Sequence, residues 1–454
     1  MKREKKQEGL NQETLKSTKQ KPSFKEAFWF WLKLGFISFG GPAGQIAIMH
    51  EFLVEKKKWI SEGRFLHALN YTMLLPGPEA QQLATYTGWL LHGTKGGLVA
   101  GILFVLPSMF ILLVLTSLYT TFGNIPWVYA MFNGLKPAVM AIVILALFKI
   151  GKKSLHTIFH FMVAIGAFVC IFFFNIPFPY IIIGALILAF ITRRIFPQLF
   201  KETSTAKEQL AKDEEEYFIN RNHFLPDAGF KIGRLLKQLF TTILIWIIPF
   251  GLFYFLTSDF AFWKQLSLFF TKAALVTFGG AYAVLPYVAQ VSVEELNWLT
   301  ELQMIDGLAL GETTPGPLVM VLVFVGFMAG FNQFDGSILM GGMGLVVTTF
   351  FTFVPCFFFI FAGAPIIEKT RENEKVKQAL TLVTAAVVGV ILNLTIYLGK
   401  AIVFPKELTL ARIDYVTLGW IAISFIAMYR FKVNMMIWIG VSALFGLGYY
   451  LVSL

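Results

Sequence analysis

The chain is built of long apolar runs that alternate with short polar breaks. Many of these runs reach about 20 residues, and a helix of that length crosses roughly 30 Å of hydrocarbon. One polar stretch, residues 196–238, is much longer than the others and divides the runs into two sets. The pattern predicts an all-α integral membrane protein with thirteen segments, at 28–50, 66–92, 97–121, 126–149, 156–174, 178–195, 239–257, 264–290, 303–330, 337–362, 376–400, 413–430 and 433–453.

Two short motifs occur once before and once after the long polar stretch. Phe39-Gly40-Gly41 returns as Phe278-Gly279-Gly280, and Pro76-Gly77-Pro78 returns as Pro315-Gly316-Pro317, each 239 residues later. At that offset the 49 residues from 30 to 78 match their counterparts at 13 positions without a gap. Identity in register over this length predicts an internal duplication.

The segment at 239–257 has no counterpart, because the same offset places it on the polar N-terminus. We therefore predict a first repeat at 28–195, a linker at 196–238, this connecting helix, and a second repeat at 264–453. A single unpaired crossing turns the second half over. The prediction is an inverted repeat of two six-segment halves.

Positive charge gathers at a few places between the apolar runs. Only 14% of the residues are charged and the net charge is +11, whereas soluble proteins have about 25% charged residues. Residues 1–27 carry eight Lys or Arg and 193–237 carry nine, whereas 120–126 and 174–180 carry none. By the positive-inside rule, the basic tail 1–27 and the linker lie in the cytoplasm of a multi-pass cell-membrane protein. We expect no nucleic-acid partner.

The loops that follow the two Phe-Gly-Gly motifs differ in charge. Residues 51–65 contain four basic residues, whereas 291–302 contain three glutamates and no base. An inverted repeat gives this asymmetry if loop 51–65 faces the cytoplasm. That placement requires the first two segments of each half to be broken or re-entrant at their glycines, which we favour over ordinary spans.

The glycines and prolines of both motifs predict helix ends inside the membrane. A helix that begins there directs unpaired N–H groups and the positive end of its dipole at one point, which suits an anion. Two lysines at matched positions add charge, and two glutamines add neutral donors. The alternative is that the glycines only allow close packing and the lysines extend to the interface. The predicted substrate-binding residues are Lys33, Gly40, Gly41, Gly77, Gln81, Gln82, Lys272, Gly279, Gly280 and Gly316.

Two acids flank the Pro-Gly-Pro motifs, Glu79 after the first and Glu312 before the second. Acids inside a membrane are uncommon and are usually functional. They are candidates for proton coupling, or they pair with Lys33, Lys272 or Arg64.

Other chemistry is not indicated. Cys170 and Cys356 both lie inside apolar runs, so neither a disulfide nor a metal site is predicted. The sequence contains no phosphate-binding loop, nucleophile motif or zinc spacing. We expect no cofactor, no metal and no enzymatic activity.

Whole segments of the chain resemble the bacterial chromate ion transporter family. The first half carries FWLKLGFISFGGPAGQIA and WISEGRFLHALNYTMLLPGPEAQQLATYTGWLLHGTKGG, and the second carries FFTKAALVTFGGAYAVLPYVAQ and ETTPGP. The resemblance covers about 24–195 and 264–453. Members of this family are inner-membrane proteins that export chromate and are linked to chromate resistance, and the long members are two fused, oppositely oriented domains. The resemblance therefore implies a secondary transporter that exports chromate.

The residues alone leave alternatives open. Sulfate and other oxyanions are alternative cargoes, and an anion channel of the same architecture also fits. An interior-negative potential favours the exit of each charge by about 2.3 kcal/mol per 100 mV, so a dianion needs no second ion to leave. The predicted partners are a small oxyanion and the lipid bilayer, and a homodimer is left open.

Overall fold

The computed structural model describes residues 21–39, 41–73, 75–195, 217–219, 231–257, 259–278, 280–367, 374–404 and 414–454. Within these residues the regular structure is helical, apart from one isolated bridge between Ile60 and Ile219. Six of the helices are long and apolar enough to cross a membrane. The prediction of an all-α membrane protein is confirmed. Most of the predicted tail and linker lies outside the described residues, as do Gly40 and Gly279.

The first half is interrupted at both of its motifs. The predicted segment 28–50 is broken after Ile37, and the predicted segment 66–92 is broken after Thr72. The long helix that follows contains a break at His92 and Gly93, which have non-helical backbone angles, with a φ of 64° at Gly93. The chain folds back there, since a Cβ on Gly88 would lie 2.6 Å from the Ala100 Cβ, and the predicted break before residue 97 is confirmed. The elements are α2 (Phe24–Ile37), α3 (Gly41–His50), η1 (Glu51–Lys56), α4 (Glu62–Thr72), α5 (Glu79–Phe122), α6 (Pro126–Ser154), α7 (Ile158–Phe174) and α8 (Phe178–Ile195).

The second half follows a single connecting helix and repeats these interruptions. The predicted segments 264–290 and 303–330 are broken after Val276 and after Thr313. The elements are the connecting helix α9 (Ile232–Leu256), then α10 (Phe260–Val276), α11 (Ala281–Gln290), η4 (Val291–Glu295), α12 (Glu301–Thr313), η5 (Leu318–Met320), α13 (Val321–Gln333), α14 (Ile338–Ile367), α15 (Glu374–Val403), α16 (Tyr415–Tyr429) and α17 (Met435–Ser453).

Several helices begin earlier than hydropathy predicts, among them α2 and α9. The Ser23 side chain caps α2 by accepting the Glu26 N–H at 3.2 Å, so the helix includes polar residues before position 28. The connecting helix begins at Ile232 instead of 239, because Arg234 and Lys237 continue it as good helix formers. Hydropathy finds the apolar part of a helix and leaves out its polar turns.

The backbone repeats its unusual conformations at the 239-residue offset. Both halves have a π-helical turn, η1 and η4, after the second helix of the first interrupted segment. Ser61 caps α4 and its counterpart Thr300 caps α12. Positive φ angles also recur in matched pairs: Gly41 and Gly280, Lys58 and Asn297, Gly77 and Gly316.

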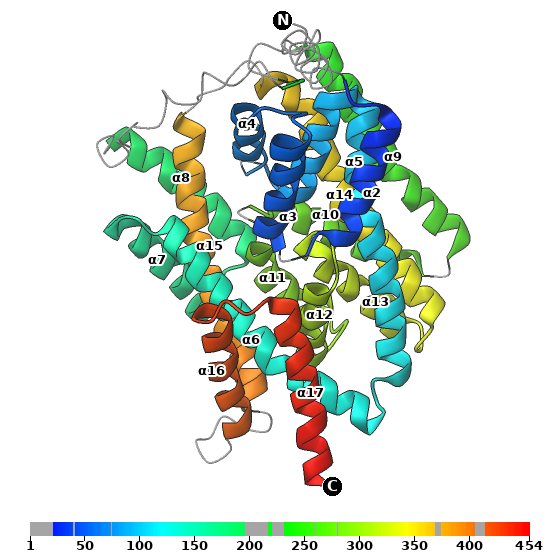
Figure 1. The fold of residues 1–454 in the computed structure, drawn as a ribbon, viewed down its shortest axis with the longest axis vertical. Helices are drawn as coiled ribbons and strands as arrows, with labels where there is room; N and C mark the ends of the chain where they lie inside the picture. Colours follow the sequence, from blue (N-terminus) through cyan, green and yellow to red (C-terminus); the bar gives the residue numbers. More distant parts are fainter. Residues whose placement is uncertain are drawn as a thin grey trace, which may run out of the picture.

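The helices form two blocks, and each block draws on both halves. In what we call the outer block, α7 and α8 pack on α15, whereas α16 and α17 pack on α6. Figure 1 shows α16 and α17 beside α6 in the lower part of the view. The approach of α17 to α6 needs glycine, because a Cβ on Gly134 of α6 would lie 2.6 Å from the Gly446 backbone of α17. The interrupted segments, α2 to α5 and α10 to α13, form with α14 what we call the broken-helix block.

Candidate functional site

The two interrupted segments of the first half end close to where they begin. Lys57, directly after η1, pairs with Glu26 in the first turn of α2 at 2.7 Å. His92, at the kink of α5, lies 2.8 Å from the Pro22 carbonyl oxygen, which precedes α2. Each segment therefore runs into the molecule, turns at its motif and returns to the same end.

The described part of the linker lies at this same end. Phe218 and Ile219 donate their backbone N–H groups to the carbonyls of Lys58 and Trp59 at 3.2 and 3.0 Å. Loop 51–65 and the linker are thus in contact. We call this end, which includes Glu26, the first-half surface.

The second half closes in the same way, at the equivalent end of its own segments. The Gln333 side chain, at the end of α13, donates to Asp259 Oδ2 at 3.0 Å, just before α10 begins. The neighbouring Asn332 donates to the Trp298 carbonyl at 2.7 Å, just after η4. We call this end the second-half surface.

Inside the molecule, each interruption is hydrogen-bonded to a turn of the other half. The Gly77 N–H donates to the Thr277 carbonyl at 2.7 Å, and the Gly316 N–H donates to the Ser38 carbonyl at 2.8 Å. Ser38 and Thr277 directly precede the two Phe-Gly-Gly motifs, so the repeat relates one bond to the other. We call these four residues and their motifs the crossed turns.

Two buried side chains of the first half hydrogen-bond to the crossed turn in which Gly316 meets Ser38. The Gln45 amide of α3 donates to the Ser38 carbonyl at 3.1 Å and also to the Gly316 carbonyl. The Ser108 hydroxyl of α5 donates to the Pro315 carbonyl. Two elements of the first half therefore fix the position of a second-half turn.

The turn glycines have no room for a side chain. At Gly77, φ is 123° and a Cβ would lie 2.7 Å from both Cys356 Sγ and Gln82 Nε2. At Gly316, φ is 96° and a Cβ would overlap the Ser108 hydroxyl. Left-handed backbone and close neighbours both require glycine here.

Helices begin at the crossed turns without side-chain caps. Pro78, Gly280 and Pro317 occupy the N-cap positions of α5, α11 and η5, and these residue types have no side chain that accepts a hydrogen bond. The first N–H groups of a helix have no partner within it, and they lie at the positive end of its dipole. The helix α3 begins at Gly41 in the same region. The arrangement suits an anion.

The glutamines after the first Pro-Gly-Pro motif are fully buried, and their amide nitrogens are engaged. Gln82 Nε2 donates to the Pro76 carbonyl at 2.7 Å, and Gln81 Nε2 donates to Thr85 Oγ1 at 3.1 Å. These bonds stabilise the turn and the first turn of α5. The role of both glutamines toward an oxyanion stays a prediction.

The two predicted acids lie at the crossed turns. Glu79 Oε1 is 3.9 Å from the position that a Cβ on Gly280 would take, so this acid of the first half reaches the motif of the second. Glu312 is buried and accepts a hydrogen bond from the Tyr282 hydroxyl of α11 at 2.6 Å. Their role in proton coupling stays a prediction.

The matched lysines lie elsewhere. Lys33 and Lys272 are exposed, and the side chains one turn on, Phe36 and Leu275, are 52% and 43% exposed. Both lysines therefore point away from the buried faces of α2 and α10. The structure does not bring them to the crossed turns, and their role in substrate binding stays a prediction.

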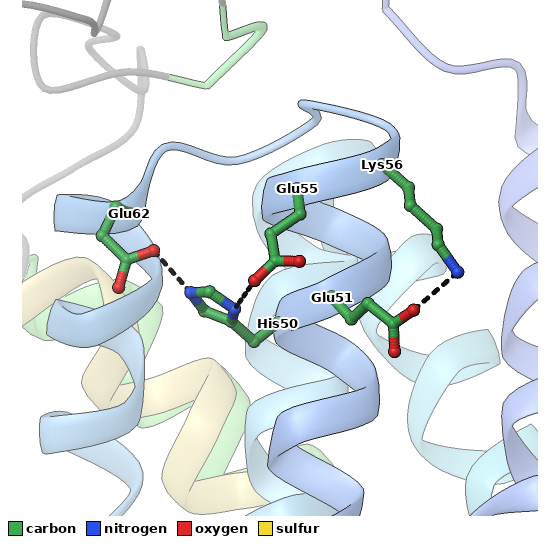
Figure 2. Close-up of polar contacts among 5 residues, drawn as sticks. All are labelled: His50, Glu51, Glu55, Lys56 and Glu62. Carbon is green, nitrogen blue, oxygen red and sulfur yellow. Dashed lines mark hydrogen bonds and ion pairs between the residues drawn. The ribbon is translucent and has the colours of Figure 1, made fainter.

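A histidine connects the two interrupted segments at the first-half surface (Figure 2). His50 Nε2 lies 2.5 Å from Glu62 Oε2, and Nδ1 lies 3.2 Å from Glu55 Oε1. On the adjacent turn, Lys56 pairs with Glu51 at 2.6 Å, and this bond lowers the pKa of Glu51. The bridge joins the end of α3 and η1 to the start of α4.

A buried charge pair was not predicted from the sequence. Lys136 of α6 lies 3.7 Å from Asp306 of α12, and each is 5% exposed. Both residues interrupt apolar runs, which is the signal that drew attention to Lys33 and Lys272. The sequence of one apolar segment does not show that its charged residue contacts a charged residue of another segment.

The fold and the crossed turns define a multi-pass membrane protein with two equivalent halves that are completed by each other. The family described as chromate transporter matches the chain over residues 25–190 and again over 264–447. The double match confirms the duplication. The chain belongs to the chromate transporter family.

Individual relatives agree with this assignment. A probable chromate transport protein of Synechococcus elongatus is 30% identical over 379 residues, covering 83% of this chain and 85% of its own. A chromate transport protein of Cupriavidus metallidurans is 28% identical over 83% of both chains. One from Pseudomonas aeruginosa is 28% identical over 434 residues, covering 93% of this chain and 92% of its own. No solved structure matches the chain.

Proposed function

We propose that the protein is a secondary transporter that exports chromate from the cytoplasm across the cell membrane, and that the crossed turns form its substrate site. The reciprocal bonds from Gly77 to Thr277 and from Gly316 to Ser38 carry this proposal. They place four helix starts, α3, α5, α11 and η5, at a junction that both halves build.

The junction has the chemistry that an oxyanion needs. Backbone N–H groups at helix starts bind oxyanions without a formal positive charge, and the dipoles favour negative charge there. Weak, neutral binding suits a carrier, because the substrate has to leave again. The names of the relatives make chromate the favoured oxyanion.

The two surfaces support an inverted membrane topology. The linker contacts the first-half surface through Ile219, and a single helix, α9, leads from the linker to Asp259 at the second-half surface. With the basic linker in the cytoplasm, the first-half surface is cytoplasmic and the second-half surface is external. The interrupted segments are then re-entrant from opposite sides, and rocking of the two halves exposes the site alternately.

Chromate accumulation in everted membrane vesicles tests the proposal. In such vesicles the cytoplasmic face points outward, so export appears as uptake driven by a lumen-positive potential. We expect saturable chromate uptake that is absent from vesicles without the protein. Uptake of labelled sulfate with no uptake of chromate would overturn chromate as the cargo, and single-channel currents in planar bilayers would show a channel instead of a carrier.

A further inference from the structure

A buried ion pair joins the two blocks away from the crossed turns. Lys136 lies in α6 of the outer block, and Asp306 lies in α12 of the broken-helix block, six residues before Glu312. Ionisable side chains inside a membrane protein are expensive to bury, and they generally serve binding or coupling. The function proposed above uses neither residue.

The carboxylate of this pair is incompletely satisfied. Asp306 Oδ2 accepts a hydrogen bond from the Tyr119 hydroxyl of α5 at 2.9 Å. Asp306 Oδ1 is buried without a hydrogen bond among the described residues, since its 3.7 Å separation from Lys136 Nζ is too long for one. One oxygen of the acid is therefore open to a proton.

The lysine keeps its own partners whether or not the acid is charged. Lys136 Nζ donates to Asn133 Oδ1 at 2.9 Å, and it lies 5.4 Å from the centre of the Tyr129 ring. An amide oxygen and an aromatic face both stabilise an ammonium group. Loss of the charge on Asp306 would leave Lys136 with these contacts.

Few other titratable groups face the acid. The helices packed against α12 are α5, α6, α13, α15 and α17. Of their described residues, α5 contributes Tyr119 and α6 contributes Lys136, while α13 has no titratable residue and α17 has only tyrosines. From α15, Tyr397 lies near Glu301, at the start of α12. Lys136 is the one charged group among these that contacts Asp306.

The pair lies near the second-half surface. Asp306 follows Glu301, the first residue of α12, by five residues, or about 7.5 Å along the helix axis. Glu294 and Glu295 precede that helix in η4. These acids attract cations and repel an oxyanion, so this surface favours the approach of protons over that of the substrate.

We infer that Asp306 is the proton-binding site that couples proton entry to chromate export, an inference that rests on the proposed function. In the step, a proton from water at the external surface bonds to Oδ1 of the carboxylate and gives the neutral acid. The ion pair with Lys136, which stays protonated, is lost. The link between α12 and α6 weakens, and the broken-helix block is free to move against the outer block.

Everted vesicles provide the test, with the membrane potential held at zero and the lumen one pH unit more acidic than the bath. Both faces are kept alkaline enough for chromate to remain the dianion. We expect the wild-type protein to raise the steady-state chromate ratio by about tenfold for each coupled proton, because one pH unit is a tenfold gradient. Asp306→Asn is expected to lose this response while it keeps uptake driven by a lumen-positive potential.

Controls separate the proton site from folding and from the proposed function. Lys136→Gln with Asp306→Asn leaves no unpaired buried charge, so it keeps the result interpretable if Asp306→Asn alone fails to fold. Asp414→Asn replaces an acid at the distant cap of α16 and is expected to respond as the wild type does. The inference would be overturned if the wild type accumulates chromate with the potential but not with the acid lumen. It would also be overturned if Asp306→Asn, alone or combined with Lys136→Gln, responds to the acid lumen as the wild type does. A wild type that accumulates no chromate under either condition would overturn the proposed function itself.

Discussion

Gly77 and Thr277 lie 200 residues apart in the chain, and the Gly77 N–H donates to the Thr277 carbonyl at 2.7 Å. The repeat gives this bond a partner, from Gly316 to Ser38. Two buried glycine turns that would otherwise leave backbone groups unpaired are thus closed by the opposite half.

Alanine at either turn glycine should disrupt the junction. In Gly77→Ala and Gly316→Ala the added Cβ meets buried neighbours at a left-handed φ, which we expect to lower the free energy of unfolding by about 1–3 kcal/mol. Thermal unfolding in detergent and chromate uptake measure the two effects. Gly166→Ala in α7, where a Cβ has open space, is the matched control and should leave both unchanged. Wild-type uptake and stability in the turn variants would count against the role of the crossed turns.

Gln45→Leu should lower the free energy of unfolding by about 1–3 kcal/mol. The substitution removes the amide that donates to both the Ser38 and the Gly316 carbonyl, and it leaves these buried groups with one hydrogen bond fewer. Thermal unfolding in detergent measures the loss. Gln265→Leu makes the same change at an exposed position of α10 and should have little effect. Equal stability of the two variants would show that the amide bridge is dispensable.

The contribution of Glu294 to the free energy of unfolding should decrease as the pH rises. Loss of hydration, together with the charges of Glu301 and Glu295, raises the pKa of Glu294 above its ordinary value of 4.5. The folded state then binds more protons than the unfolded state, so this group's contribution decreases as the pH passes from 4.5 towards the raised pKa. Glu294→Gln should therefore be more stable than the wild type at neutral pH and equal to it in acid.

Glu51→Gln is the matched control for this pH dependence, with the opposite sign. Its hydrogen bond to Lys56 lowers the pKa of Glu51, so the ionised acid stabilises the folded state at neutral pH and loses that effect as the pH falls. Unfolding temperatures measured between pH 4 and pH 8 (roughly, the range in which carboxylates change charge) compare the two variants. A gain in stability for Glu51→Gln at neutral pH would contradict the assignment.

Matched positions of the two halves should face opposite sides of the membrane. In a background of Cys170→Ala and Cys356→Ala, Lys56→Cys and Glu295→Cys place single thiols at equivalent exposed sites. An impermeant maleimide should label Glu295→Cys in intact cells and Lys56→Cys only in everted vesicles. Labelling of both from one side would contradict the inverted topology.

The exposed lysines give a further prediction. Lys33→Ala and Lys272→Ala should abolish chromate uptake if these residues supply charge to the substrate, and both variants should still insert in the membrane. Lys264→Ala, at another exposed position of α10, is the control and should transport normally. Normal transport by Lys33→Ala and Lys272→Ala would instead favour a role at the membrane interface.

Sequence analysis predicted the interruptions because glycine and proline encode them locally. A positive φ at Gly77 and the absence of N–H donors at Pro76 and Pro78 follow from the residue types themselves. The same reasoning predicted the break between residues 92 and 97, where Gly93 has a φ of 64° and the chain folds back on itself. A glycine at such a position allows a left-handed backbone that other residue types rarely adopt.

The composition of the site was less predictable because it depends on which face of a helix points inward. Lys33 and Lys272 match in register, but register does not show that the packing partner of α2, which is α5, covers the opposite face. The contact between Lys136 and Asp306 joins two segments whose separate patterns contain no information about each other. Both facts follow only from tertiary packing.

The crossed turns also determine how the chain reaches its folded state. A first half without the second would leave the Gly77 N–H and the Ser38 carbonyl without these partners in an apolar environment, and a second half alone would leave Gly316 and Thr277 in the same condition. Neither half is therefore an independent folding unit, although each contains a full set of interrupted helices. The final assembly must wait until the last-synthesised half has inserted, and the two halves behave as obligate subunits that share one polypeptide.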